Sequence, residues 1–172
     1  NNVDHCTRLC HASSVAALLE TIGSGAVTAP FYEVEHSDVI IVIGANPTEN
    51  HPVAATFMKN ATKEGKKLIV MDPKQVEIAR HATHFLQFKP DTDVALLNAI
   101  MKSIIDQDLV DSDFIKNRTK DFENLKNHLK DYTPEKMSKI CGISVRKINE
   151  IAKIYATSPA SIIFWGMGIS QH

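Results

Sequence analysis

The sequence predicts an α/β fold with three layers built around a mostly parallel sheet. Four short apolar runs each end in a polar or glycine-containing turn, at 39–43, 67–71, 84–88 and 161–165. A helical pattern separates each run from the next, so the connections are expected to be right-handed crossovers between parallel strands. The run 39–43 contains only Val and Ile, which is typical of a strand buried on both faces.

A chain of 172 residues is long enough to bury a substantial core, and we expect residues 1–172 to form one α/β domain with a helix-rich portion at 108–158. The formal net charge of −1 gives no electrostatic basis for binding nucleic acid or an anionic membrane. The apolar runs fall far short of the roughly 20 residues that span a bilayer, so we expect no membrane segment.

Three cysteines, an odd number, argue against a disulfide framework and favour a reducing compartment such as the cytoplasm. No signal peptide is visible at the start. Because the chain begins at Asn1 without a methionine, we expect it to be an internal piece of a longer protein.

The first half is expected to contain a polar loop, a helix, a second loop, a strand and a second helix, at 1–14, 15–22, 24–37, 39–43 and 52–64. Ser13 or Ser14 is expected to cap the first helix, because serine oxygens accept bonds from N–H groups of a first turn. Gly23 and Gly65 mark the ends of the two helices. Pro52 is tolerated in a first helical turn.

The second half alternates strands with helices. Strands are expected at 67–71, 84–88 and 161–165 and helices at 75–79, 94–106, 111–117, 121–130, 134–140 and 144–156. Thr92 or Asp93 is a good N-cap for the strongly periodic helix 94–106, and Ser144 is the expected cap of the last helix.

The turns that leave the strands should lie along one edge of the sheet, because ligand crevices form at the carboxyl ends of parallel strands. These turns are polar or glycine-rich and lie at 46–50, 72–73, 89–93 and 166–171. They match neither the GxGxxG pattern nor the GxxxxGK[ST] pattern of phosphate-binding loops. Taken together, they predict a nucleotide-like ligand at this edge.

Single residues in these turns have two interpretations each. Asp72 can bind a ribose or base, or it can cap the turn before Pro73. Lys74 can meet a phosphate or be an ordinary surface charge. Gly166 and Gly168 can allow a ligand close to the backbone or form a plain tight turn.

The dipeptide Cys10-His11 is the sharpest candidate site. A thiolate is a soft metal ligand, and a neighbouring histidine can exchange a proton near neutral pH. Other interpretations are a buried cysteine beside a surface histidine, or a zinc site made by His5, Cys6, Cys10 and His11. A further one takes Cys6 and Cys10 as the first two ligands of an iron–sulfur cluster. Cys141, in a helix-rich region, is expected to be structural.

Five motifs then occur in order along the chain, NNVDHCTRLCHASSV, IGANPTENHP, MDPKQVEIA, FKPDTDVALLNA and WGMGISQ. They resemble the molybdopterin oxidoreductase superfamily, and within it the catalytic (alpha) subunits of formate dehydrogenases. The resemblance covers essentially the whole chain. It implies a Rossmann-like domain of a larger catalytic subunit.

The resemblance also implies roles for individual residues. Cys10 falls where the family has the cysteine or selenocysteine that ligates molybdenum or tungsten, and His11 matches the histidine that follows this ligand in formate dehydrogenases. The resemblance implies that the remaining matches contact a molybdopterin guanine dinucleotide, and they are Gly44, Asn46, Glu49, Asn50, Asp72, Pro73, Lys74, Asp91, Thr92, Asp93, Met167 and Gln171. Of these, Met167 and Gln171 match a pair that lies beside the pterin in the family.

The implied reaction is the two-electron oxidation of formate to carbon dioxide at a bis-molybdopterin guanine dinucleotide centre. The resemblance implies a 4Fe-4S cluster in an amino-terminal domain outside this chain, further domains of the same subunit, and an electron-transfer subunit as partner. The chain alone is expected to lack cofactor and to be inactive. The alternatives are a related oxidoreductase acting on nitrate, arsenite or another oxyanion, and a metal-free nucleotide-binding or structural subunit.

Overall fold

The chain forms two compact units in a computed structural model that describes residues 2–27 and 29–171. The sheet unit comprises Asn1–Phe85 and Ala160–His172, and the helical unit comprises Leu86–Pro159. The helical unit begins before the helix-rich portion expected at 108–158. The assignment of residues 1–172 to one domain remains a prediction.

The sheet has four strands in the order β3-β2-β1-β4. They are β1 (Val39–Ile43), β2 (Lys67–Met71), β3 (His84–Leu86) and β4 (Ser161–Trp165). The central strand β1 pairs in parallel with both β2 and β4. All five residues of β1 are buried, which confirms the prediction of an interior strand. β3 is two residues shorter than the predicted run 84–88.

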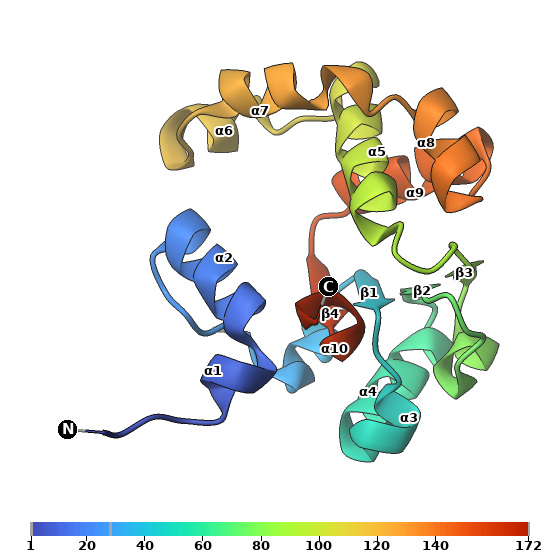
Figure 1. Cartoon of the computed structure of the whole chain (residues 1–172). Helices are drawn as coiled ribbons and strands as arrows, with labels where there is room; N and C mark the ends of the chain where they lie inside the picture. Colours follow the sequence, from blue (N-terminus) through green and yellow to red (C-terminus); the bar gives the residue numbers. More distant parts are fainter. Residues whose placement is uncertain (1, 28, 172) are drawn as a thin grey trace. The chain divides into compact units, whose positions relative to one another are not determined.

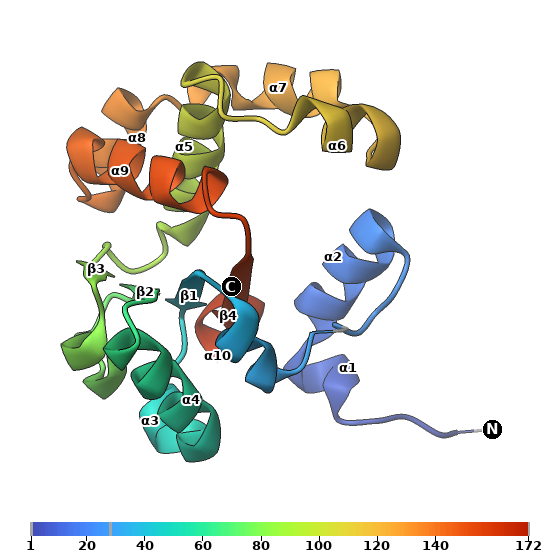
Figure 2. The ribbon, with the colours of Figure 1, turned by 180° about the vertical axis from the view of Figure 1, so that it is seen from behind.

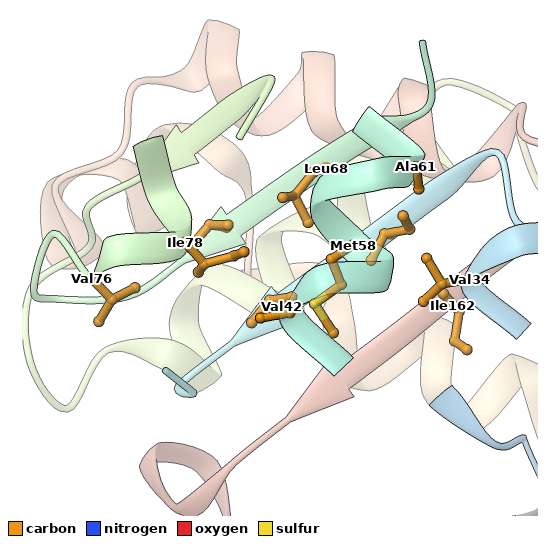
Figure 3. Packing of buried hydrophobic residues seen from close by; sticks show 11 residues of the cluster. Val34, Val42, Met58, Ala61, Leu68, Val76, Ile78 and Ile162 are labelled. Atoms are coloured by element: carbon orange, nitrogen blue, oxygen red, sulfur yellow. The ribbon is translucent and has the colours of Figure 1, made fainter. Parts of the chain in front are cut away.

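One face of the sheet packs against α4 (Pro52–Lys63) and forms the core of the sheet unit (Figure 3). Side chains alternate between the faces of a strand, so Ile40 and Val42 of β1 point to the same face. Met58 of α4 packs there with Leu68 of β2. Ala55, Met58 and Ala61 are spaced by three residues, which places them on one side of the helix.

Several local predictions for the sheet unit are wrong. A short helix α1 (Thr7–Cys10) lies inside the predicted polar loop 1–14. Helix α2 (Ala12–Ile22) begins three residues early, so Ser13 and Ser14 lie inside it and do not cap its start. The predicted loop 24–37 contains the 3-10 helix η1 (Phe31–His36), which is stabilised by the complete burial of Val34.

Two further short helices occur in turns that follow strands. They are α3 (Pro47–Asn50) after β1 and α10 (Met167–Ser170) after β4. A 3-10 helix η2 (Glu77–His81) takes the place of the predicted helix 75–79, and its Ile78 is buried in the core.

The helical unit contains α5, α6, α7, η3, α8 and α9, at Asp93–Asp106, Ser112–Arg118, Phe122–His128, Leu129–Asp131, Pro134–Cys141 and Val145–Ala156. α5 packs against α8 and α9, as Figure 2 shows. Ser144 caps α9 as predicted, because its Oγ accepts a hydrogen bond from the N–H of Lys147. Cys141 is completely buried, in agreement with its predicted structural role. No helix among the described residues is long and apolar enough to cross a membrane.

Candidate functional site

The predicted metal ligand Cys10 is the last residue of α1, immediately before the junction with α2 (Figure 1). His11 forms the junction: its N–H donates to the carbonyl of Thr7 over 2.8 Å, and its carbonyl accepts the N–H of Val15 over 2.9 Å. The Cys10 side chain is partly exposed and that of His11 is exposed. Both side chains are therefore accessible to a ligand.

The structure brings Cys10 together with Met167 and Gln171, the pair that the resemblance places beside the pterin. The Sγ atom of Cys10 lies 3.8 Å from the Sδ atom of Met167. The Nε2 atom of Gln171 donates to the carbonyl of Cys10 over 2.7 Å. Helix α10 and the residue that follows it therefore contact the Cys10 side chain and its backbone.

The turns after β1 and β4 touch through glycines. The N–H of Gly168 donates to the carbonyl of Gly44 over 3.0 Å. A Cβ atom on Gly168 would lie 2.8 Å from the Cα atom of Gly44, and a Cβ atom on Gly44 would lie 2.9 Å from the carbonyl carbon of Gly168. The close approach expected at Gly166 and Gly168 is thus made by the protein's own backbone. This contact fixes α10, and with it Met167, at the carboxyl end of β1.

The turn after β1 is held by Asn46. Its Oδ1 accepts the hydroxyl of Thr48 over 2.6 Å, and its carbonyl accepts the N–H groups of Glu49 and Asn50. These bonds form the short helix α3 and leave the side chains of Glu49 and Asn50 exposed. Both predicted cofactor contacts are therefore accessible in the turn that follows β1.

The turn after β2 is closed by Asp72, whose Oδ1 accepts the N–H of Lys74 over 2.8 Å. The capping interpretation of Asp72 is therefore correct, and a ribose contact remains a prediction. Burial raises the pKa of the Asp72 carboxyl, and the hydrogen bond and positive charge of Lys74 oppose this rise. Pro73 is half-buried and Lys74 is exposed. Because β2 neighbours β1 in parallel, this turn lies at the same edge as Gly44.

The third predicted segment, Asp91 to Asp93, belongs to the helical unit. Thr92 is the N-cap residue of α5 as predicted, but its hydroxyl donates to the carbonyl of Lys89 over 2.6 Å instead of binding the helix. Asp93 is buried in the first turn, and Asp91 has a positive φ of 59°. That these residues reach the cofactor remains a prediction.

Sequence reasoning missed four residues that join the start of α2 to the ends of β4 and α10. The Oγ atom of Ser14 lies 2.6 Å from the Oγ atom of Ser170 and accepts the indole N–H of Trp165 over 3.0 Å. Ser13 donates its hydroxyl to the carbonyl of Ser170. These serines lie within the quoted motifs, but neither the motifs nor the residue pattern gave them a role at this site, and Ser13 or Ser14 was expected to be a helix cap.

A metal ion at Cys10 would need donors beyond the side chains nearby. Within residues 2–27 and 29–171, no group of three or more His, Cys, Asp or Glu is placed to hold a metal ion. The zinc interpretation with His5 and Cys6 therefore has no support. A single accessible thiol at a polar sheet edge does fit a metal whose other donors are the sulfur atoms of a bound cofactor, because soft sulfur ligands suit such metals.

The whole sequence was compared with known protein families. The family model described as molybdopterin oxidoreductase matches residues 1–172. The chain belongs to the molybdopterin oxidoreductase family.

Within this family, the chain is similar to formate dehydrogenases. The chain is 45% identical over 171 residues to the F420-dependent formate dehydrogenase 1 subunit alpha of Methanococcus maripaludis, a match that covers 99% of this chain and 25% of the relative. It is 39% identical to formate dehydrogenase H of Escherichia coli, covering 99% of this chain and 24% of the relative. The chain thus spans about a quarter of the length of these relatives.

A solved structure supports the same fold. Acetylene hydratase from Pelobacter acetylenicus superposes with a TM-score of 0.84 at 28% sequence identity. The superposition covers 95% of this chain and 22% of that enzyme. The fold class expected from the sequence is confirmed.

Proposed function

We propose that the full-length protein is a formate dehydrogenase catalytic subunit that oxidises formate to carbon dioxide, one proton and two electrons. The observation that carries this proposal is the placement of the Cys10 thiol against Met167 and Gln171, at the sheet edge formed by the turns after β1 and β4. The names of its relatives support formate as the substrate.

The residues of this chain would hold and orient the reacting groups. Cys10 would supply the protein ligand to molybdenum or tungsten, and Gln171 would fix the backbone that carries this ligand. His11, exposed beside Cys10, would accept the released proton or orient formate. When bound, the bis-molybdopterin guanine dinucleotide centre supplies the two-electron redox chemistry.

Polar turns at the sheet edge would bind the dinucleotide. Asn46 shapes the turn that presents Glu49 and Asn50, and the Gly44 backbone lies at its base. The remaining predicted contacts are Asp72, Pro73, Lys74, Asp91, Thr92 and Asp93. Hydroxyl, amide and carboxylate groups of this kind suit a ribose and a guanine base, and Lys74 offers a positive charge for a phosphate.

The rest of the enzyme would come from residues outside this chain. We include in the proposal a 4Fe-4S cluster in an amino-terminal domain, an arginine that neutralises formate, and an electron-transfer subunit that receives the electrons. A cytoplasmic location belongs to the same proposal.

A first experiment tests the ligand role of Cys10 in the full-length enzyme. Cys10→Ser should lower formate turnover by at least about 100-fold and reduce the molybdenum and tungsten content, since replacing even an outer partner of a metal ligand costs about 10- to 100-fold. Cys6→Ser is the matched control, because Cys6 is exposed one helical turn earlier. Retained metal and turnover in Cys10→Ser would contradict the proposal.

A second experiment tests His11. His11→Ala should reduce kcat for formate by about 10²-fold, the usual range for a positioned acid or base, and should change the pH profile. His5→Ala is the control, because His5 is also exposed and lies before α1. An unchanged profile would remove the role assigned to His11.

Substrate profiling separates the remaining alternatives. Turnover with nitrate or arsenite but not formate would assign the enzyme to a related oxidoreductase. A metal-free and inactive full-length protein would favour a nucleotide-binding or structural subunit.

A further inference from the structure

The segment that carries Cys10 has little apolar anchorage. No described residue of α1 or α2 is buried. Leu9 and Leu19 are 78% and 53% exposed, so these helices place large apolar side chains in solvent. Packing into the core therefore contributes little to fixing the position of the Cys10 thiol.

Instead of apolar packing, polar contacts hold α2 against the end of β4 and the end of α10. Ser14 meets both Trp165 and Ser170, and Ser13 donates to the carbonyl of Ser170. Ser170 is only 6% exposed, so the two hydrogen bonds that it makes with Ser13 and Ser14 are partly shielded from water.

The direction of these bonds follows from their chemistry. The indole N–H of Trp165 can only donate, so the Ser14 oxygen accepts there. The hydroxyl proton of Ser14 is then available for the Ser170 oxygen, 2.6 Å away. Ser14 thus links the end of β4 to the end of α10, and removing either its hydroxyl or the indole N–H breaks this link.

The hydrogen bonds of Ser14 constrain Cys10 through two elements, the helix α2 that follows it and the helix α10 that contacts it. Ser13 and Ser14 lie in the first turn of α2, directly after Cys10 and His11. Ser170 lies in α10, whose Met167 contacts the Cys10 sulfur. The hydrogen bond between Ser14 and Ser170 therefore joins α2, which follows Cys10 in the chain, to α10, which contacts the Cys10 side chain.

We infer that Trp165, Ser14 and Ser170 are positioning residues that fix the Cys10 thiol at the sheet edge. This inference rests on the proposed function for its role in catalysis. Its structural content, that the hydrogen bonds order the segment 7–16, is independent of which substrate the enzyme uses.

The test uses full-length protein and two variants that each remove one hydrogen-bonding group. Trp165→Phe removes the N–H while retaining an aromatic ring, and Ser14→Ala removes the hydroxyl. Thr21→Val is the control, because the Thr21 hydroxyl donates only to the carbonyl of Ala17 within α2. Ser14→Thr restores a hydroxyl and should rescue the effect of Ser14→Ala.

Amide hydrogen exchange of peptides covering 7–16 is the first readout. Each variant should exchange about fivefold faster there, the fold-change that corresponds to losing about one hydrogen bond, while peptides of β1 stay unchanged. The double variant should exchange no faster than the faster single variant, because both break the same link. Unchanged exchange, or effects that multiply, would overturn the inference.

Alkylation of Cys10 in cofactor-free protein, relative to Cys6 in the same molecule, is the second readout. The ratio should rise in both variants, and kcat per bound metal should fall in the loaded enzyme. Faster exchange without a change in the Cys10 ratio would also overturn the inference. If Cys10→Ser retains turnover while the exchange and alkylation effects persist, the proposed function fails but the positioning of Cys10 stands.

Discussion

The Cys10 sulfur lies 3.8 Å from the Met167 sulfur, although 157 positions separate the two residues in the sequence. Met167 is held where it is because the glycines on either side of it pack against the backbone at the end of β1. As a thiol, Cys10 can donate a weak hydrogen bond to the thioether, and as a metal-bound thiolate it cannot. If Cys10 binds the metal as proposed, this contact in the loaded enzyme would be packing between two side chains.

Met167→Leu should then be tolerated, whereas Met167→Ala should not. Leucine keeps a side chain of similar volume beside Cys10, and alanine leaves a gap. We expect formate turnover per bound metal to stay within about tenfold for Met167→Leu, since such swaps usually cost under about 1.5 kcal/mol. It should fall further for Met167→Ala. Equal losses in the two variants would show that the sulfur atom itself is required.

Gly44→Ala should destabilise the protein more than Gly65→Ala. Both glycines have positive φ values, 57° and 91°, so both variants carry the backbone strain of the left-handed region. Only at Gly44 would the new Cβ also meet backbone, 2.9 Å from the carbonyl carbon of Gly168. We expect this contact to cost about 1 to 3 kcal/mol beyond Gly65→Ala, the usual range for overpacking.

Denaturant unfolding of the two variants measures this difference, and a lower stability for Gly65→Ala would contradict it. The metal content of the same two variants should also differ. Because Gly168 precedes Gln171 in the turn that contacts Cys10, Gly44→Ala should also reduce metal content, and Gly65→Ala should not.

The sheet could be predicted from the sequence because its signals are local. Val39–Ile43 is apolar throughout, Lys67–Met71 is apolar after its first residue, and both runs end at turn residues, so strand position and parallel pairing follow from the pattern. The carboxyl-edge turns follow from the same argument. The start of helix α9 was also predictable, because Ser144 binds an N–H of its own first turn.

The packing around Cys10 could not be predicted in this way. Ser13 and Ser14 have the composition of a helix cap, yet their hydroxyls bind Ser170, far along the chain. Helix α1 is four residues long and carries no apolar periodicity. The contact between Gly44 and Gly168 forms only when two turns meet in space, so it cannot be predicted from the sequence of either turn alone. Here the motif resemblance identified Met167 and Gln171, and residue patterns did not.

The three cysteines should differ in reactivity in the order Cys6, Cys10, Cys141. Cys6 is exposed, Cys10 is partly covered by Met167, and Cys141 is completely buried. Alkylation of folded, cofactor-free full-length protein, followed by mass spectrometry, should label Cys6 first and leave Cys141 unlabelled until denaturant is added. Binding of the metal cofactor should protect Cys10 alone. Equal labelling of Cys6 and Cys10 in the loaded enzyme would contradict the ligand role.

Asp72→Asn should stabilise the protein near neutral pH, and the gain should disappear in acid. Burial raises the pKa of the folded Asp72 above its ordinary value of 3.8, so the ionised carboxylate lowers the stability of the native state at higher pH. As the pH falls through the raised pKa towards 3.8, the native state takes up the proton more readily than the unfolded state and this loss is recovered. Asparagine retains an oxygen that can accept the N–H of Lys74.

Asp131→Asn is the control with the opposite sign. The hydrogen bond from Lys136 lowers the pKa of Asp131, so its carboxylate contributes stability that is present above pH 3.8 and is lost as the pH falls through the lowered pKa. Melting temperatures measured between pH 3 and pH 7, as differences from the unmodified protein, should therefore rise with pH for Asp72→Asn and fall for Asp131→Asn. If the melting-temperature differences of the two variants changed with pH in the same direction, burial in the turn after β2 would not destabilise the charged form of Asp72. A ribose bound there would then meet a carboxylate with the properties of an ordinary surface group.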